Sequence, residues 1–326
     1  MAARPYLLFF ACAVFSPGVV SFSISDKRAC PCSDPSLCKP VDVPPRPELL
    51  GFATESALHW KLYNYTYITT LAVFGNITLD PQVWREGERE GEGYCSLYPL
   101  VLDYKRMSTT RPLSRLQMVC TAHERGVRVL LAASFDSSQI NSSVYRQTWV
   151  KEQVSKVEAS FTDGVNVDFE GPIPSGSSLN SDFVSMMAEL NTQLKAALPG
   201  SQLSIDVAWS PACVDGRCFD HLGLSQHVDY MVMMAYDESS QVLGPCIAMA
   251  NSPLLKTMQG ALGFIETGVP REKLVVGLPW YGYDYTCQSL TSAGECTISE
   301  VPWRGIKCSN AAGRQESYSA IPALLK

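Results

Sequence analysis

Seven short apolar stretches, each about the length of a β-strand, recur along the chain, and helical patterns lie between several of them. This alternation favours parallel strands joined by crossover helices, and the number of strands favours a barrel over an open sheet. A chain of 326 residues is long enough for one such barrel of about 250 residues. The seven stretches are Leu49–Thr54, Ile68–Phe74, Val127–Ala133, Val165–Glu170, Leu203–Trp209, Tyr230–Tyr236 and Leu274–Leu278.

The clearest helical pattern covers Asp182–Leu198, where apolar residues repeat at helical spacing. Ser181 is expected to cap its start, and Pro199 to mark its end. Seven strands are one short of a TIM (β/α)8-type barrel, and the segment that reaches Lys326 resembles neither a strand nor a natural terminus. The sequence therefore predicts an α/β protein of this type, over residues 48–326, that lacks its last strand in this chain.

The N-terminus has the features of a secretory signal peptide. Arg4 precedes an apolar run from Tyr6 to Val14, and the small residues Val19 and Ser21 offer a cleavage site. We assign residues 1–21 to this peptide. A membrane anchor is the alternative, but the run is shorter than the roughly 20 apolar residues that a spanning helix needs.

Cysteine usage agrees with the secretory route. Twelve cysteines occur, and eleven remain once the leader with Cys12 is removed. Because eleven is odd, at least one thiol is free, intermolecular, or waiting for a partner that this chain lacks. Residues 22–47, rich in cysteine and proline, are expected to form a strap held by disulfides. A zinc knuckle is the alternative, but the sequence contains no CxxC pair.

Three sequons could carry glycans in that route, at Asn64, Asn76 and Asn141. The net charge of −6 gives no basic footprint for nucleic acid. Residues 81–111 show no periodicity and read as a solvated loop insertion, with a mispredicted exon as the competing explanation. The four histidines show no metal-binding spacing, so we expect neither a metal nor another cofactor.

The segment from Asp163 to Glu170 carries the chemistry, because its polar and apolar residues alternate with the two-residue period of a strand. Asn166, Asp168 and Glu170 share the inward face. Two carboxyls so close inside a barrel should give at least one of them a raised pKa, as a general acid requires. Structural ion pairs are the alternative, which the lack of Lys and Arg in the segment argues against.

These residues, DGVNVDFE, resemble the DGxDxDxE signature of family-18 glycoside hydrolases, the chitinase-like barrels. Asn166 stands where most of that family has Asp, and this form resembles the family's chitobiase branch. The stretch that begins with Asp206-Val207 also resembles that branch. Met234-Ala235-Tyr236-Asp237 is similar to the family's MxYD motif, and Gly277–Gly282 to its seventh-strand segment.

The resemblance implies a retaining, substrate-assisted cleavage of β-1,4 N-acetylglucosamine linkages, in which the sugar supplies its own nucleophile. Glu170 would be the acid, Asp168 would stabilise the acetamido group, and Tyr236 would hold its oxygen. Asn166, which can donate a hydrogen bond to Asp168, and Asp237 would support them. Asp163 would be structural.

Aromatic residues near strand ends offer flat faces for sugar rings, although a core role is an alternative for each. They are Phe52, Trp209, Trp280 and Tyr281. The resemblance implies an oligosaccharide substrate that contains N-acetylglucosamine, such as the chitobiose core of free N-glycans. We expect a monomer without a membrane anchor, in the lysosome or outside the cell. A secreted chitinase and a carbohydrate-binding protein without catalysis remain the alternatives.

Overall fold

The computed structural model describes residues 30–42, 46–53, 58–74, 110–238, 245–303, 306–318 and 320. The predicted signal peptide, Asn76, Cys95 and nearly all of the predicted loop insertion lie outside these residues. None of the helices described is long and apolar enough to cross a membrane.

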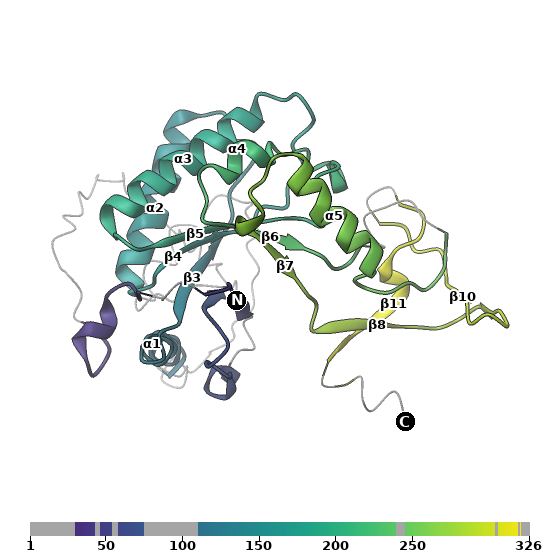
Figure 1. Ribbon diagram of the computed structural model, residues 1–326, viewed down its shortest axis with the longest axis horizontal. Coiled ribbons are helices and arrows are strands. Elements are labelled where there is room, and N and C mark those ends of the chain that lie inside the picture. Colours follow the sequence, from purple (N-terminus) through teal and green to yellow (C-terminus); the bar gives the residue numbers. More distant parts are fainter. Residues whose placement is uncertain are drawn as a thin grey trace, which may run out of the picture.

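Seven parallel strands form one sheet in which each strand pairs with its neighbours in chain order. The sheet curls into a half-barrel (Figure 1), as in a TIM barrel that lacks one strand. This confirms the predicted fold class and all seven predicted strands. Their bounds are β1 Leu50–Ala53, β2 Thr70–Val73, β3 Arg128–Ala133, β4 Gly164–Val167, β5 Gln202–Ala208, β6 Tyr230–Met234 and β7 Leu274–Gly277.

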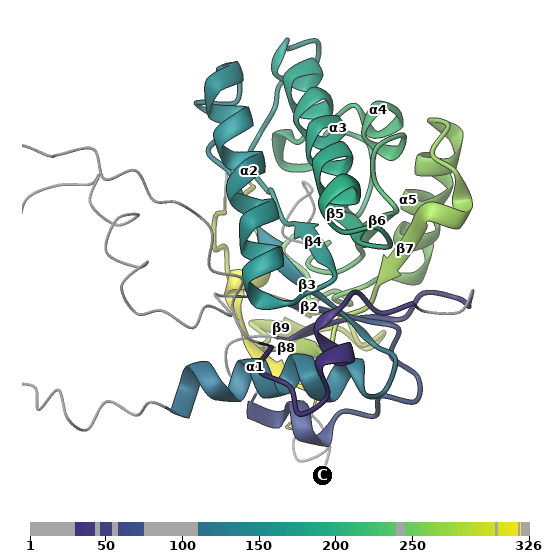
Figure 2. The ribbon, with the colours of Figure 1, turned by 90° about the vertical axis from the view of Figure 1, so that its left-hand side faces the viewer.

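Helices follow the strands as crossovers. Figure 1 shows α2, α3 and α4 along one face of the sheet, with α1 near β3 and α5 near β6 and β7. Figure 2 shows α1 below the other helices. The longest, α3, begins at Leu179 with Ser178 at its N-cap, so the prediction that Ser181 caps it is wrong. The Ser181 hydroxyl instead donates to the Ser178 carbonyl. The helices are α1 Thr110–His123, α2 Ser143–Ser160, α3 Leu179–Ala197, α4 His221–Ser225 and α5 Leu254–Glu266.

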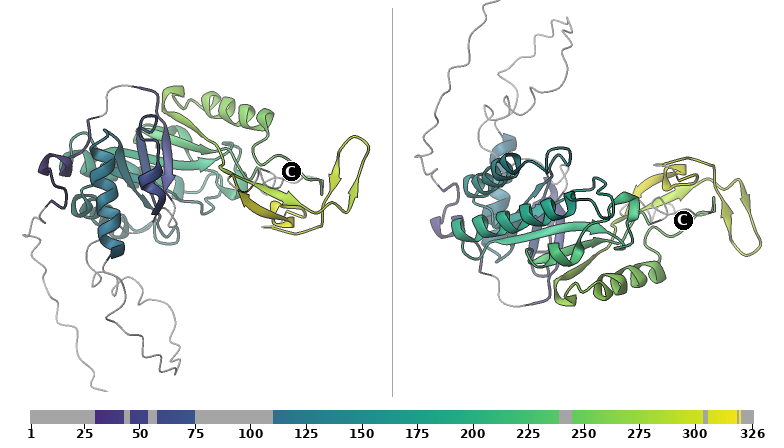
Figure 3. Two further views of the ribbon diagram at one scale, coloured as in Figure 1. Left: turned by 90° about the horizontal axis from the view of Figure 1, so that it is seen from below. Right: turned by 90° about the horizontal axis from the view of Figure 1, so that it is seen from above.

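A second structural unit follows β7. Its strand β8 (Tyr281–Tyr285) pairs antiparallel with β11 (Gly313–Ser317), and the short strands β9 (Ser289–Leu290) and β10 (Cys296–Thr297) form a hairpin. Figure 3 shows this extension projecting from the end of the half-barrel that lies away from the purple N-terminal segment. The extension therefore forms a wall beside the sheet without adding a strand to it.

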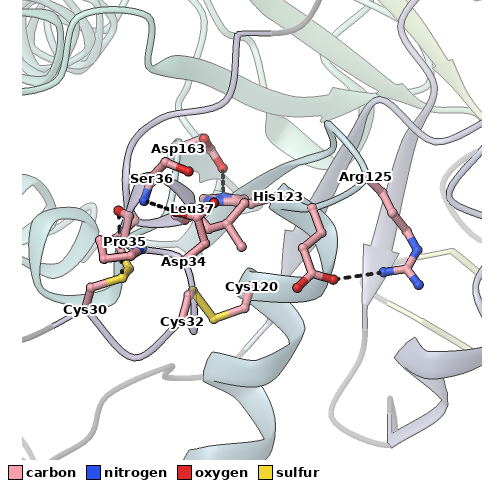
Figure 4. Close-up of a disulfide and its surroundings, with 12 residues drawn as sticks. Cys30, Cys32, Asp34, Pro35, Ser36, Leu37, Cys120, His123, Arg125 and Asp163 are labelled. Atoms are coloured by element: carbon pink, nitrogen blue, oxygen red, sulfur yellow. Dashed lines mark hydrogen bonds and ion pairs between the residues drawn. A yellow bond between two sulfur atoms is a disulfide. The ribbon is translucent and has the colours of Figure 1, made fainter.

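The N-terminal strap is held by disulfides, as predicted. Cys30 pairs with Cys38, and Cys32 pairs with Cys120 of α1. The sulfur atoms of the three strap cysteines lie within 4.8 Å of one another, but they serve these disulfides (Figure 4). All ten cysteines in the described residues are paired, the other three disulfides being Cys213–Cys218, Cys246–Cys308 and Cys287–Cys296.

Asp163 fixes the strap to the start of β4. It is fully buried, and its carboxylate accepts hydrogen bonds from Val41 N at 2.6 Å, Val129 N at 2.6 Å and His123 Nε2 at 2.8 Å. The other ring nitrogen of His123 lies 2.6 Å from the Leu37 carbonyl. Figure 4 shows Asp163 beside His123, next to the strap. These contacts fit the structural role predicted for Asp163.

Candidate active site

Strand β4 positions the polar residues of the signature. Gly164 begins it, and a Cβ there would lie 1.8 Å from the Gln202 carbonyl oxygen of β5, so only glycine fits. The strand ends at Val167, three residues earlier than predicted, although Asp168 N still donates to Ala133 O at 2.8 Å. Asp168 and Glu170 therefore lie just beyond the carboxyl end of the strand, where barrels place their functional groups.

Phe169 anchors the backbone between the two carboxyls. Its ring is 4% exposed and stacks on Phe135 with the ring centroids 4.0 Å apart. Phe183 of α3 packs edge-on against it at 5.7 Å. Because Phe169 is fixed in the core beneath the helices, its neighbours in sequence are turned to the opposite side, as the two-residue period predicts.

Glu170 forms an ion pair with Arg217. Arg217 Nη1 lies 2.9 Å from Glu170 Oε2, and the two side chains are 1% and 49% exposed. The lack of Lys and Arg in the signature segment argued against an ion pair, and this expectation is wrong for Glu170, because its partner comes from 47 residues further along the chain. The loop that carries Arg217 is closed by the Cys213–Cys218 disulfide and pairs with Ile173, which follows β4.

Asp168 has a perturbed protonation equilibrium. Burial raises its pKa, the negative charge of Glu170 raises it further, and Arg217 partly opposes both, which gives a value of about 6. The prediction that one of the two carboxyls has a raised pKa is therefore confirmed for Asp168. Its Oδ1 atom is shielded from solvent and has no hydrogen-bond partner among the described residues.

The prediction that Asn166 donates a hydrogen bond to Asp168 is wrong. Its Nδ2 donates to Asp206 Oδ2 at 2.7 Å, and its Oδ1 accepts from the Ser204 hydroxyl at 2.6 Å. Both of these partners belong to β5, which pairs with β4 so that Asn166 lies opposite Ser204. Asp206 is thus a site residue for which no role was predicted. The signal was present, since Ser204 and Asp206 alternate with apolar residues as the signature does.

Tyr236 and Asp237 follow β6. Burial raises the pKa of Tyr236, and the charges of Asp206, Asp168 and Glu170 raise it further, so its phenol remains a proton donor. Asp237 accepts hydrogen bonds from the hydroxyls of Tyr281 at 2.8 Å and Tyr283 at 2.7 Å. The two carboxylate oxygens of Asp237 therefore link the sheet to strand β8.

A cavity of about 450 Å³ lies between the sheet and the extension. Glu170 and Asp237 line it from the sheet side, so the structure brings these two predicted residues together. The remaining lining residues come from segments in which no site was predicted, and most belong to the extension. They are Asp215, Tyr283, Trp303, Ser309, Asn310, Ala311, Gly313 and Gln315.

The predicted sugar-stacking aromatics have different surroundings. Tyr281 contacts two predicted site residues, since its hydroxyl donates to Asp237 and its ring packs edge-on against that of Tyr236. Trp209 packs against α5, where a Cβ on Gly260 would lie 1.9 Å from its carbonyl oxygen. Trp280 is 77% exposed beside Tyr318, and Phe52 lies against Phe74. None of the four lines the cavity.

The predicted glycosylation sites that the structure describes are accessible. Asn64 and Asn141 are both exposed, in the segment before β2 and in the turn before α2. Exposure is required for an acceptor asparagine, and glycosylation of these residues stays a prediction.

Comparison with known proteins identifies the family. Residues 61–320 match the model of Glycosyl hydrolases family 18. The chain is 36% identical over 304 residues to "Probable di-N-acetylchitobiase 2" of Dictyostelium discoideum, and 34% identical over 292 residues to the di-N-acetylchitobiase of Mus musculus. The alignments cover 91% and 90% of this chain and 69% of each relative.

Solved structures share the fold. A class V chitinase from Nicotiana tobaccum, in complex with NAG4, gives a TM-score of 0.62 at 18% identity and covers 86% of this chain and 79% of its own. A chitinase from Cycas revoluta, in complex with (GlcNAc)3, gives 0.60 at 16% identity, with 85% and 79% covered. The chain therefore belongs to the glycosyl hydrolases of family 18 and is a glycosidase.

Proposed function

We propose that the protein hydrolyses β-1,4 linkages between N-acetylglucosamine units with retention of configuration, and that Glu170 is its catalytic acid. The observation that carries this proposal is the meeting of Asp168, Glu170 and Tyr236, from the ends of β4 and β6, in one electrostatically coupled group. Glu170 opens from this group into the cavity. The names of the relatives support a substrate built from N-acetylglucosamine.

Glu170 protonates the leaving glycosidic oxygen in this mechanism. Since Arg217 occupies Oε2, the proton that is transferred resides on Oε1. Transfer leaves a carboxylate, whose negative charge the adjacent guanidinium stabilises. The same carboxylate then acts as base and activates the water that completes hydrolysis.

Asp168 and Tyr236 act on the 2-acetamido group of the substrate. Its oxygen attacks the anomeric carbon and forms an oxazolinium ion, so the protein needs no nucleophile of its own. Asp168 accepts the acetamido N–H and stabilises the positive charge that develops on it. Tyr236 donates its hydroxyl proton to the acetamido oxygen and holds the reactive orientation.

The substrate is a short oligosaccharide, such as the chitobiose core of free N-glycans. The product profile on chito-oligosaccharides with free and blocked reducing ends distinguishes a chitobiase from a chitinase. Release of single N-acetylglucosamine units only from free reducing ends would support the chitobiase assignment, whereas internal cleavage of blocked substrates would support a chitinase.

We further propose that the protein acts in the secretory pathway, with the lysosome as its destination and the extracellular space as the alternative. Five disulfides support an oxidising compartment during folding. The exposed sequons at Asn64 and Asn141 fit the same route.

The deciding experiment is the variant Glu170→Gln, assayed on a chromogenic chitobioside. Loss of the acid should lower kcat by about 10²- to 10⁴-fold. Glu152→Gln is the matched control, because Glu152 is 55% exposed, pairs with Lys156 of the same helix and lies on α2. Undiminished turnover in Glu170→Gln would remove Glu170 from its role. Sugar binding without hydrolysis at any pH, in the unmodified protein, would instead favour a carbohydrate-binding protein.

A further inference from the structure

A chain of hydrogen bonds between buried polar side chains starts on β5, passes through β4 and returns to β5 beside the candidate site. The Ser204 hydroxyl donates to Asn166 Oδ1, and Asn166 Nδ2 donates to Asp206 Oδ2. Ser204 and Asn166 are fully buried, and Asp206 is 2% exposed. The direction of both hydrogen bonds leads toward Asp206, so this carboxyl receives the last donor of the chain.

The other oxygen of Asp206 has no partner in the described part of the molecule. Asp206 Oδ1 is shielded from solvent, as is Asp168 Oδ1. An ionised carboxylate with an unpartnered oxygen is costly in the interior, and a second carboxylate nearby increases the cost. Burial raises the pKa of Asp206 well above its ordinary value, and the charge of Asp168 raises it further. Because Asn166 occupies Oδ2, the proton of the neutral acid belongs on Oδ1.

We propose that Asp206 is a neutral carboxylic acid in the folded protein and a positioning residue for the reaction, whose Oδ1–H donates a hydrogen bond to the Asp168 carboxylate. This inference rests on the proposed function, in which Asp168 accepts the acetamido N–H as an anion. A neutral donor behind Asp168 supports that anion without adding charge. It also gives the site a proton-bearing carboxyl on β5, while Asn166 on β4 cannot ionise.

The charged groups that face Asp206 favour its neutral form, whereas the hydrogen bond from Asn166 lowers its pKa and opposes them. Asp168 and Glu170, which follow β4, each raise its pKa by their negative charge. Tyr236, which follows β6, is a neutral phenol, and the Asn166 amide is the only donor to Asp206 within the described residues. Arg217 is paired with Glu170 and acts on Asp168, so it does not neutralise Asp206.

Two substitutions at this position test the proposal through the pH dependence of kcat/KM. Asp206→Asn places an amide N–H where the Oδ1 proton lies and keeps an acceptor toward Asn166, but it cannot ionise. Asp206→Ala removes the donor. On its acidic side, the pH profile of kcat/KM falls where Asp168 becomes protonated. The midpoint of this acidic limb should stay at the same pH in Asp206→Asn and shift to a pH about one unit higher in Asp206→Ala.

A downward movement of the limb in Asp206→Asn would overturn the proposal, because it would mean that a negative charge had been removed. An unmoved limb in Asp206→Ala would overturn it as well. A merely structural role predicts loss of folded protein in both variants without a shift of the limb, and circular dichroism of each variant measures that loss.

A second measurement does not depend on turnover. The infrared difference spectrum between the unmodified protein and Asp206→Asn at neutral pH should show a carbonyl stretch of a protonated carboxylic acid that the variant lacks. A carboxylate band in its place would overturn the proposal. If the unmodified protein proved inactive, the proposed function would fail while the infrared result would still report the state of Asp206.

Discussion

The Nη1 atom of Arg217 lies 2.9 Å from Oε2 of Glu170, and the arginine is buried while the glutamate is half exposed. A guanidinium that is 1% exposed requires a counter-charge, so Glu170 is bound at one oxygen and open at the other. Arg217 is in turn held by its loop, since its Nε donates to the Val214 carbonyl at 3.4 Å. The candidate acid is thus oriented by a residue fixed in the interior.

Arg217→Met should lower kcat by about 10- to 100-fold and change KM less, because the acid loses both its orientation and the charge that stabilises its carboxylate. Steady-state kinetics on a chromogenic chitobioside measures this. Arg146→Met is the control. Arg146 forms a partly buried ion pair with Asp182, with Nη1 and Oδ1 2.8 Å apart, and neither residue lines the cavity. Equal kcat values for the two variants would show that Arg217 does not orient the acid.

Tyr281→Phe should lower kcat/KM by about tenfold, because it removes one of the two hydroxyls that hold the Asp237 carboxylate. The same substitution at Tyr283 should have a similar effect, since its hydroxyl binds the other oxygen. Tyr145→Phe is the control: its hydroxyl accepts from Asp136 N, outside the candidate site. Unchanged kinetics in both Asp237-binding variants would contradict a role for this carboxylate in substrate turnover.

The sheet and the carboxyls of the site could be predicted from the sequence because both depend on local periodicity. Each of the seven strands is a short apolar run, and a two-residue period assigns Asn166 and Asp168 to the face opposite Phe169. The ends of the helices and strands were harder to predict from the sequence. Ser178 and Ser181 are equally plausible helix caps in the sequence, and only the packed structure decides between them.

Contacts between distant segments could not be predicted. Arg217 lies 47 residues from Glu170, and nothing in its neighbourhood in the sequence indicates this pairing. The Asn166 amide has two acidic neighbours in space, and the register of β4 on β5 directs it to Asp206. Trp303 and Asn310 reach the cavity through an extension whose fold depends on antiparallel pairing of β8 with β11. Such pairings are set by tertiary packing, for which a single sequence gives no direct signal.

Stability should fall as the pH rises above about 6.5, because of His123. Burial lowers the pKa of this histidine, but the hydrogen bond and charge of Asp163 outweigh burial and hold the pKa above its ordinary value. The folded state therefore binds the proton more tightly, and the stabilisation is lost once the pH exceeds the raised pKa. Urea unfolding at a series of pH values measures this. His123→Gln should flatten the alkaline side of the profile, and an unchanged slope would contradict the assignment.

The acidic side of the same profile should depend on His221. Burial lowers the pKa of His221 to about 4, so the folded state resists protonation of this ring. Stability should therefore fall as the pH drops from about 6.5 toward 4. His221→Phe, which keeps an aromatic ring against Phe264, should remove this dependence while leaving the alkaline side as in the unmodified protein. A loss on the alkaline side would mean that the two histidines are coupled.

Removing the Cys32–Cys120 disulfide should destabilise the protein more than removing Cys287–Cys296. The first closes a separation of 88 residues and the second one of 9. Restriction of the unfolded chain then contributes about 4.5 kcal/mol in the first case and about 2.5 kcal/mol in the second. Urea unfolding of the two double serine variants measures the difference.

Since neither disulfide lines the cavity, folded protein of both variants should keep its kcat. An equal or larger loss of unfolding free energy for the Cys287–Cys296 variant would show that the strap, with its hydrogen bonds to Asp163 and His123, stays docked without its covalent link.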